Sequence, residues 1–220
     1  MKILISIVIC VIIVVIFGLI ASGVWGRHVE GLRKTRASLD SKERIKILKY
    51  LYNKIVDIFN EYDIPLWLEF GTLLGYRREN NIICYDDDLD FGAFYSDKNR
   101  IIKVLRQLEH ESDDIKIDYK CRLGVCSYGI VYKPIKLSAD ISVYHVNDKS
   151  LTPSLITHIY RNCKQMPKKD YLPLKRVNFL DKDIYVPNNT DKVLLDEYGK
   201  SFMLPSHKCD ENCNNCHRIS

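Results

Sequence analysis

The stretch that decides the fold runs from residue 66 to residue 92 and reads LWLEFGTLLGYRRENNIICYDDDLDFG. Its apolar start, Leu66–Leu68, predicts a short buried strand, and Gly71-Thr72 predicts a turn that opens a helix. Four aspartates then occupy five positions in Asp86–Asp90. Carboxylates this close repel one another, and a hard divalent cation relieves the repulsion. A solvated acidic loop is the alternative, but apolar residues on both sides favour a metal-bound site for phosphate chemistry.

The helix start at Gly71 is the expected phosphate-binding side of this site. Helix N-termini present unpaired N–H groups and a positive dipole end, which together hold a phosphate. Gly71 allows close approach of the backbone, Thr72 supplies a hydroxyl, and Arg78 can clamp a diphosphate together with Arg77. The alternatives are a plain turn for the Gly-Thr pair and solvated surface charges for the arginines.

The expected metal ligands come from two strands. Side chains in a strand alternate between faces, so Asp86, Asp88 and Asp90 are predicted to share one face while apolar neighbours enter the core. A second strand, Leu137–Val146, carries Asp140 inside a β-rich run, where an acid needs a partner or a metal. Asp88, Asp90 and Asp140 are therefore predicted as metal ligands and catalytic residues. A salt-bridged or edge-strand Asp140 is the alternative.

Hydrophobic periodicity and capping residues predict the remaining elements. They are a helix over 41–62, a helix from Asp97 to about His110, strands around Ile115–Tyr119 and Gly129–Tyr132, a hairpin over Val177–Val186, and a helix over Thr190–Tyr198.

Composition bounds the class of protein. The 220 residues are 46% apolar, with a formal net charge of +5 and no long basic run, which predicts a folded chain without a nucleic-acid partner. Residues 3–25 carry no charge, and this length predicts a transmembrane signal anchor at 1–26, followed by a basic stem at 27–44. A cleaved signal peptide, cut near Ala21, is the alternative. The expectation is a single-pass membrane protein.

The orientation of that anchor is open. Basic residues after the apolar segment place the body in the cytoplasm by the positive-inside rule. Eight cysteines and one glycosylation sequon at Asn188 favour an oxidising ER or Golgi lumen instead. In the Cys-rich tail, 206–220, the residues Cys209, Cys213, Cys216 and His217 offer either a structural zinc site or disulfides.

The combination of Gly71–Gly75, Arg78, Ile83 and Asp86–Asp90 resembles the LicD and fukutin-related family of phosphotransferases. A later pattern, from Phe179 through Pro187 to Pro205, is similar to the closing segment of the family. The resemblance defines a catalytic domain at 45–205. It implies an α+β fold, a nucleotidyltransferase-like mixed β-sheet flanked by helices, here preceded by the N-terminal transmembrane helix.

The same resemblance implies an enzyme that moves phosphocholine or ribitol phosphate from a CDP-linked donor to a glycan or glycoprotein acceptor. By motif position, Asp88 and Asp90 form the metal pair for Mg²⁺ or Mn²⁺, with Asp140 as third ligand, and Gly71, Thr72 and Arg78 bind the donor phosphates. The alternatives are a nucleotidyltransferase proper, which attaches a nucleotide and releases pyrophosphate, and a non-catalytic lumenal relative that binds nucleotide or glycan.

Overall fold

The structure, a computed structural model, describes residues 39–122, 125–152, 166–205, 207–209, 213 and 216–218. The chain divides into two compact units, Met1–Leu39 and Asp40–Ser220, and the fold below is that of the second. Its described α-helices are α2 (Ser41–Glu61), α3 (Phe70–Glu79), α4 (Lys98–Glu111), α6 (Lys168–Tyr171) and α7 (Thr190–Tyr198), with a 3₁₀ turn η1 (Tyr95–Asp97). Its described strands are β1 (Leu66–Leu68), β2 (Asp88–Phe94), β3 (Ile115–Arg122), β4 (Val125–Tyr132), β5 (Leu137–Val146), β6 (Ser150–Thr152), β7 (Met166–Pro167), β8 (Lys175–Phe179), β9 (Lys182–Val186), β10 (His207–Cys209) and β11 (Cys216–Arg218).

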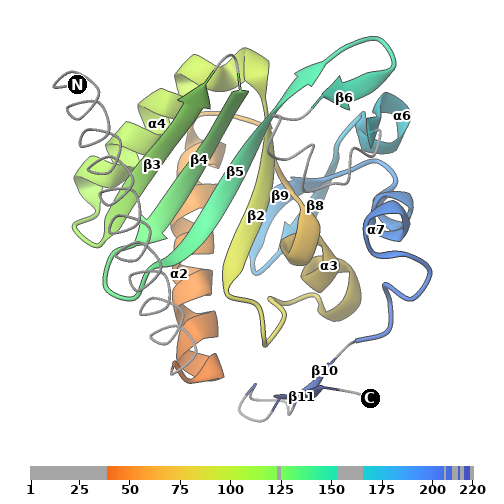
Figure 1. Ribbon diagram of the computed structural model, residues 1–220. Coiled ribbons are helices and arrows are strands. Elements are labelled where there is room, and N and C mark those ends of the chain that lie inside the picture. The colour runs from red at the N-terminus through yellow and green to blue at the C-terminus, as the bar shows by residue number, and fades with distance from the viewer. Residues whose placement is uncertain are drawn as a thin grey trace, which may run out of the picture. The chain divides into compact units, whose positions relative to one another are not determined.

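One large mixed sheet organises these elements. Its strands follow the order β3-β4-β5-β2-β1-β9-β8, and β6 and β7 extend it beside β5 (Figure 1). The pairs β2–β5 and β1–β9 are parallel, whereas β1–β2, β4–β5 and the two outer hairpins are antiparallel. The sheet is therefore mixed and flanked by helices, as the sequence predicted, with the acidic strand β2 near its centre.

The core lies between this sheet and α2 and α4, which stand behind the sheet in Figure 1. Asp40 caps α2 by accepting a hydrogen bond from the Lys42 N–H. Every third or fourth residue of α2 is apolar, so one face of the helix is buried. The buried side of the sheet consists of alternate strand residues, such as Leu89 and Phe91 on β2 and Ile141 on β5. The neighbours between them, including the aspartates, face the opposite side.

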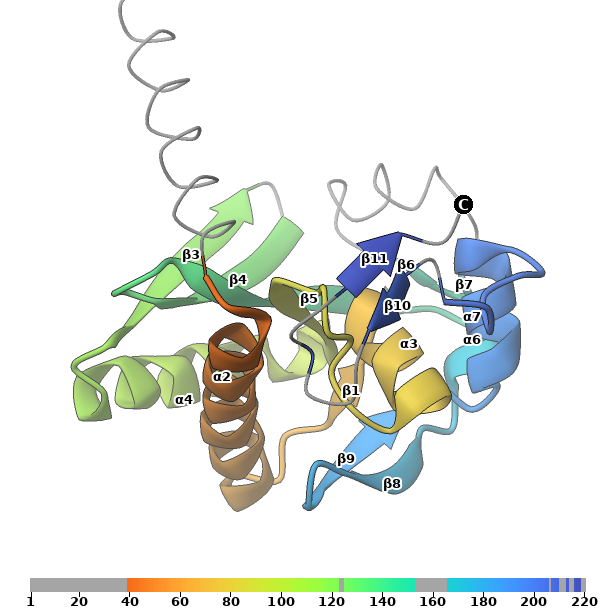
Figure 2. The ribbon, with the colours of Figure 1, turned by 90° about the horizontal axis from the view of Figure 1, so that it is seen from below.

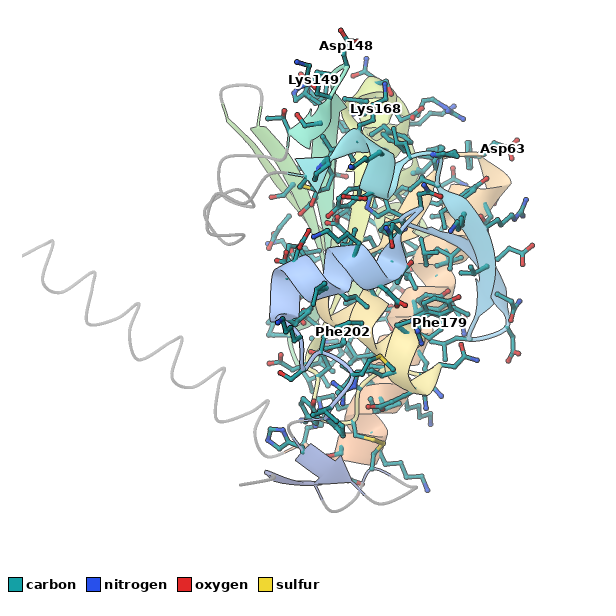
Figure 3. All side chains as sticks on the ribbon, turned by 90° about the vertical axis from the view of Figure 1, so that its right-hand side faces the viewer. Asp63, Asp148, Lys149, Lys168, Phe179 and Phe202 are labelled. Carbon is teal, nitrogen blue, oxygen red and sulfur yellow. A yellow bond between two sulfur atoms is a disulfide. The ribbon has the colours of Figure 1, made fainter. Side chains whose placement is uncertain are left out.

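Helices α3 and α7 lie on the other side, in front of the sheet in Figure 1. Phe179, at the end of β8, accepts a hydrogen bond from the buried Tyr52 hydroxyl and packs edge-on against the Tyr76 ring of α3 (Figure 3). The short helix α6 joins the sheet because its Lys168 N–H donates to the Lys149 carbonyl, 2.8 Å away. The ring contact holds α3 against β8, and α3 also packs directly on β2, the strand that carries Asp88 and Asp90.

The prediction of an N-terminal transmembrane helix needs correction. The segment 1–26 assigned to it lies outside the described residues. Within the described part of the chain, no helix is both long and apolar enough to cross a bilayer. The long helix α2 has 21 residues, but its outer face is lined with charged side chains. No helix of the described residues therefore supports the prediction of a single-pass membrane protein.

Candidate active site

Two adjacent strands bring the three predicted aspartates together. In the parallel β2–β5 pair, Asp90 lies directly opposite Asp140, and Asp88 lies opposite Ser138. Paired residues of neighbouring strands share a face, as do residues two apart in one strand, so all three carboxylates are on the same face. Burial raises the pKa of Asp90 well above its usual value, and the negative charges of Asp88, Asp86 and Asp140 raise it further. Such a site favours a proton or a cation.

Asp86 and Asp87 lie in the loop before β2 rather than on the strand, because β2 begins at Asp88. Consecutive aspartates disfavour a strand, and the Asp86 N–H instead closes a turn onto the Ile83 carbonyl at 2.9 Å. The prediction that Asp86 continues the strand was therefore wrong. The loop nevertheless keeps Asp86 beside the strand, where oxygens of Asp86, Asp87 and Asp88 lie within 4.8 Å of one another.

The environment of Asp86 is unfavourable for a carboxylate without a cation. Burial raises its pKa to about 7, and the charges of Asp88 and Asp87 act in the same direction. A hydrogen bond from the Asp87 backbone and the positive charge of Arg44 oppose this rise but do not cancel it. Near neutral pH the Asp86 carboxyl group is therefore partly protonated, and a bound cation would favour loss of its proton.

The start of α3 is packed directly against the acidic residues. A Cβ added to Gly71 would lie 2.6 Å from the Asp86 Oδ2 atom, so a larger residue would force that carboxylate out of its present position. The buried Thr72 hydroxyl accepts a hydrogen bond from the Asp90 N–H at 2.8 Å. Both residues of the predicted phosphate-binding pair therefore contact the acidic segment. Their role toward a phosphate stays a prediction.

The two arginines of α3 have different surroundings. Arg77 forms a two-pronged ion pair with Asp191 of α7, with its Nε atom 2.6 Å from Oδ1, at the surface. The Arg78 side chain is only 5% exposed, and its Nη2 atom lies 3.4 Å from Glu79. Because Arg78 follows Gly71 by seven residues, both lie on the same side of the helix. The structure thus leaves Arg78 as the candidate phosphate ligand and gives Arg77 a structural contact.

Sequence reasoning missed two charged residues of the site. Glu69 is 1% exposed, and its carboxylate accepts hydrogen bonds from the Trp67 indole at 3.1 Å and from the Tyr144 hydroxyl. Its N–H also donates to the Asp90 carbonyl at 3.0 Å, which joins β1 to the acidic strand. An acid between the apolar LWL triplet and Phe70-Gly71 was the available signal for its burial.

Arg44 is the second residue that was missed. It belongs to α2, yet its Nη2 atom donates to the carbonyl of Cys84 at 2.9 Å. Cys84 lies in the acidic loop, residues 80–87, which joins α3 to β2. On α2 alone Arg44 resembles the other charges of the exposed face, and it lies 40 residues from Cys84. No local sequence pattern predicts a contact over that separation.

The C-terminal tail is bonded to the same loop. Cys213 forms a disulfide with Cys84, and the His207 ring lies against the Tyr85 ring with 4.2 Å between centroids. The sequence left zinc and disulfides open for the tail. Since Cys213 is in a disulfide, its sulfur is not free to serve with Cys209, Cys216 and His217 as a zinc ligand while that bond is intact.

A family model described as "LicD/FKTN/FKRP, nucleotidyltransferase domain" matches residues 63–189, more than half of the chain. This chain belongs to the LicD/FKTN/FKRP family. The match includes the start of α3, the acidic loop, β2 and β5, so the predicted membership is confirmed on the segments that build the site.

Individual relatives are distant. "Uncharacterized protein RP689" of Rickettsia prowazekii is 28% identical over 137 residues, which are 60% of this chain and 47% of that protein. The human "Ribitol-5-phosphate transferase FKTN" is 27% identical over 172 residues, 73% of this chain and 34% of that protein. The chain therefore spans about a third to a half of the length of these relatives. Among solved structures, that of the antibiotic-resistance factor ANT(2'')-Ia has a TM-score of 0.48 at 12% identity and covers 73% of this chain and 75% of its own.

Proposed function

We propose that this protein is a divalent-metal-dependent transferase that moves a phospho-substituent from a CDP-activated donor to a hydroxyl of a glycan. The observation that carries the proposal is the shared face of Asp88, Asp90 and Asp140 on two paired strands. Family membership supports the reaction class, and the name of the human relative supports ribitol phosphate as one candidate for the transferred group. Phosphocholine is the other candidate.

The donor atoms fit a hard cation. Three carboxylates offer only oxygen ligands, which Mg²⁺ and Mn²⁺ prefer over nitrogen or sulfur. Burial first, and then the charges of the neighbouring carboxylates, raise the pKa of Asp90, so a negative charge at this position is costly without a counter-ion. Asp88 and Asp90 would hold the ion, with Asp140 as a third ligand. Once bound, it supplies charge neutralisation at the donor diphosphate and at the leaving group.

The residues of the chain orient the reactants. Gly71 places the donor diphosphate at the start of α3, where N–H groups favour it, and Arg78, two turns further along the same side of α3, adds positive charge. Asp140, paired with Asp90 on the neighbouring strand β5, orients the acceptor hydroxyl and takes its proton. The hydroxyl oxygen then bonds to the phosphorus that carries the transferred group, the bond from that phosphorus to the bridging oxygen breaks, and CMP leaves with the bond electrons.

Product analysis with labelled CDP-linked donors and Mn²⁺ tests this proposal. We expect CMP release and label on the glycan, both of which stop when Mn²⁺ is chelated or in Asp90→Asn. Asp183→Asn is the matched control, because Asp183 is an exposed carboxylate on β9 of the same sheet, paired with Arg176. Full turnover in Asp90→Asn, or without any divalent ion, would refute the assignment. Transfer of a nucleotide from an NTP, with pyrophosphate as product, would favour a nucleotidyltransferase proper.

A further inference from the structure

The C-terminal tail touches the acidic loop although it lies beyond residue 189, where the family match ends. Its strands β10 and β11 pair antiparallel and are seen close to the acidic loop in Figure 2. The disulfide joins residues 129 positions apart, and Cys213 is only 9% exposed. The ring contact of His207 with Tyr85 is a second attachment. Both attachments reach adjacent residues, Cys84 and Tyr85, directly before Asp86.

The acidic loop needs such attachments. Residues 80–87 are in neither a helix nor a strand, so no ladder of backbone hydrogen bonds defines their path. Oxygens of Asp86, Asp87 and Asp88 lie within 4.8 Å of one another, and repulsion between charged carboxylates at this separation opposes the arrangement. In the described residues, the turn bond from the Asp86 N–H to the Ile83 carbonyl and the bond from Arg44 to the Cys84 carbonyl oppose this repulsion.

We propose that the tail is a positioning element for the acidic loop, whose Asp86 lies beside the proposed metal ligand Asp88, with Cys84, Cys213, Tyr85 and His207 as its positioning residues. The covalent bond fixes the backbone immediately before Asp86 and keeps its carboxylate against Gly71 and beside Asp88. When the bond is cut, the loop moves outward and the site binds a divalent ion less tightly. The consequence for turnover rests on the proposed transferase function, whereas the consequence for the loop itself does not.

The proposal makes the site sensitive to thiols. A dithiol such as dithiothreitol reduces the Cys84–Cys213 bond to two thiols and is itself oxidised to a cyclic disulfide, so the electrons balance. Residues that orient metal ligands without binding the metal themselves typically lower metal affinity by about 10-fold or more when they are removed. We therefore expect reduction to raise the Kd for Mn²⁺ about 10-fold.

The experiment compares the oxidised protein, the reduced protein and Cys84→Ser/Cys213→Ser. Calorimetric titration with Mn²⁺ gives the affinity, and hydrogen exchange gives the protection of amides 85–90. We expect weaker Mn²⁺ binding and faster exchange in the reduced protein and in the double variant, with no further effect of dithiothreitol on the double variant. Exchange in β9 is the internal control for an intact fold. His207→Ala should produce a smaller effect, about a 2- to 3-fold rise in the Kd for Mn²⁺. Reduction of the disulfide in this variant should raise the Kd further.

The outcomes separate this proposal from the proposed function. Unchanged exchange over 85–90 after reduction overturns the tail proposal, whatever the activity. Faster exchange with unchanged Mn²⁺ affinity also overturns it, because the tether then does not serve the carboxylates. Weaker Mn²⁺ binding and faster exchange in a protein that transfers no CDP-linked group support the tail proposal and count against the transferase. If the oxidised protein binds no Mn²⁺, the metal site fails and the tail proposal is overturned with it.

Discussion

Gly71→Ala should separate catalysis from stability. Gly71 lies in the first turn of α3, where alanine is favoured over glycine by about 1 kcal/mol in helix propensity. The new Cβ would meet the Asp86 Oδ2 atom at 2.6 Å. That oxygen must retreat by roughly 1 Å to reach an ordinary van der Waals separation. Because it is the end of a side chain, it can do so, and the stability of the fold should change by less than about 1 kcal/mol.

The site should respond much more strongly than the fold. A displacement of roughly 1 Å in a group that holds the reactants can cost about 100-fold in rate. We therefore expect transfer by Gly71→Ala to fall about 100-fold and Mn²⁺ to bind more weakly. The assays are turnover with a CDP-linked donor, calorimetric titration with Mn²⁺, and urea unfolding of the same preparation.

Two other glycines supply controls with opposite signatures. A Cβ on Gly199 meets nothing within 4 Å, but its φ of +82° strains any side chain, so Gly199→Ala should lose about 1 kcal/mol of stability and no turnover. A Cβ on Gly92 would lie 2.1 Å from the ring of the fully buried Trp67, so Gly92→Ala should cost about 1–3 kcal/mol or more. Normal turnover and Mn²⁺ binding in Gly71→Ala, or a loss of stability like that of Gly92→Ala, would refute the reasoning.

Three further predictions concern single groups. In the metal-free protein, the pKa of Asp86 is raised to about 7, so the native state keeps a proton that the unfolded chain releases near pH 4. The free energy of unfolding should therefore fall as pH rises from about 4 to about 7, by at most on the order of 4 kcal/mol. Urea unfolding at pH 5 and pH 8 measures this, and an equal slope in Asp86→Asn would contradict it. Tyr52→Phe removes the hydrogen bond to the Phe179 carbonyl and should cost about 1 kcal/mol in thermal unfolding, with no change in Mn²⁺ affinity. A double-mutant cycle on the exposed Arg77–Asp191 pair should give a coupling below about 1 kcal/mol, and a value of several would show that solvent does not screen this pair.

Local patterns predicted much of the fold. The strand Leu137–Val146 and the helix Thr190–Tyr198 have the predicted ends, and α2 ends one residue before the predicted limit. These elements carry their own signals, because alternation, three-to-four-residue spacing and capping residues depend only on neighbours along the chain. The common face of Asp88 and Asp90 followed from the same alternation. The alternation did not predict where β2 starts. The strand begins only at Asp88, because consecutive aspartates disfavour a strand.

The sequence by itself determined the family and the identity of the acidic residues, because both depend on motifs a few residues long. Only the tertiary structure decided which distant groups complete the site. The pairing of Asp90 with Asp140, the burial of Glu69 between Trp67 and Tyr144, and the bond from Cys84 to Cys213 join residues from separate elements. Such contacts depend on the order of strands in the sheet and on the path of the chain around it, which no local period records.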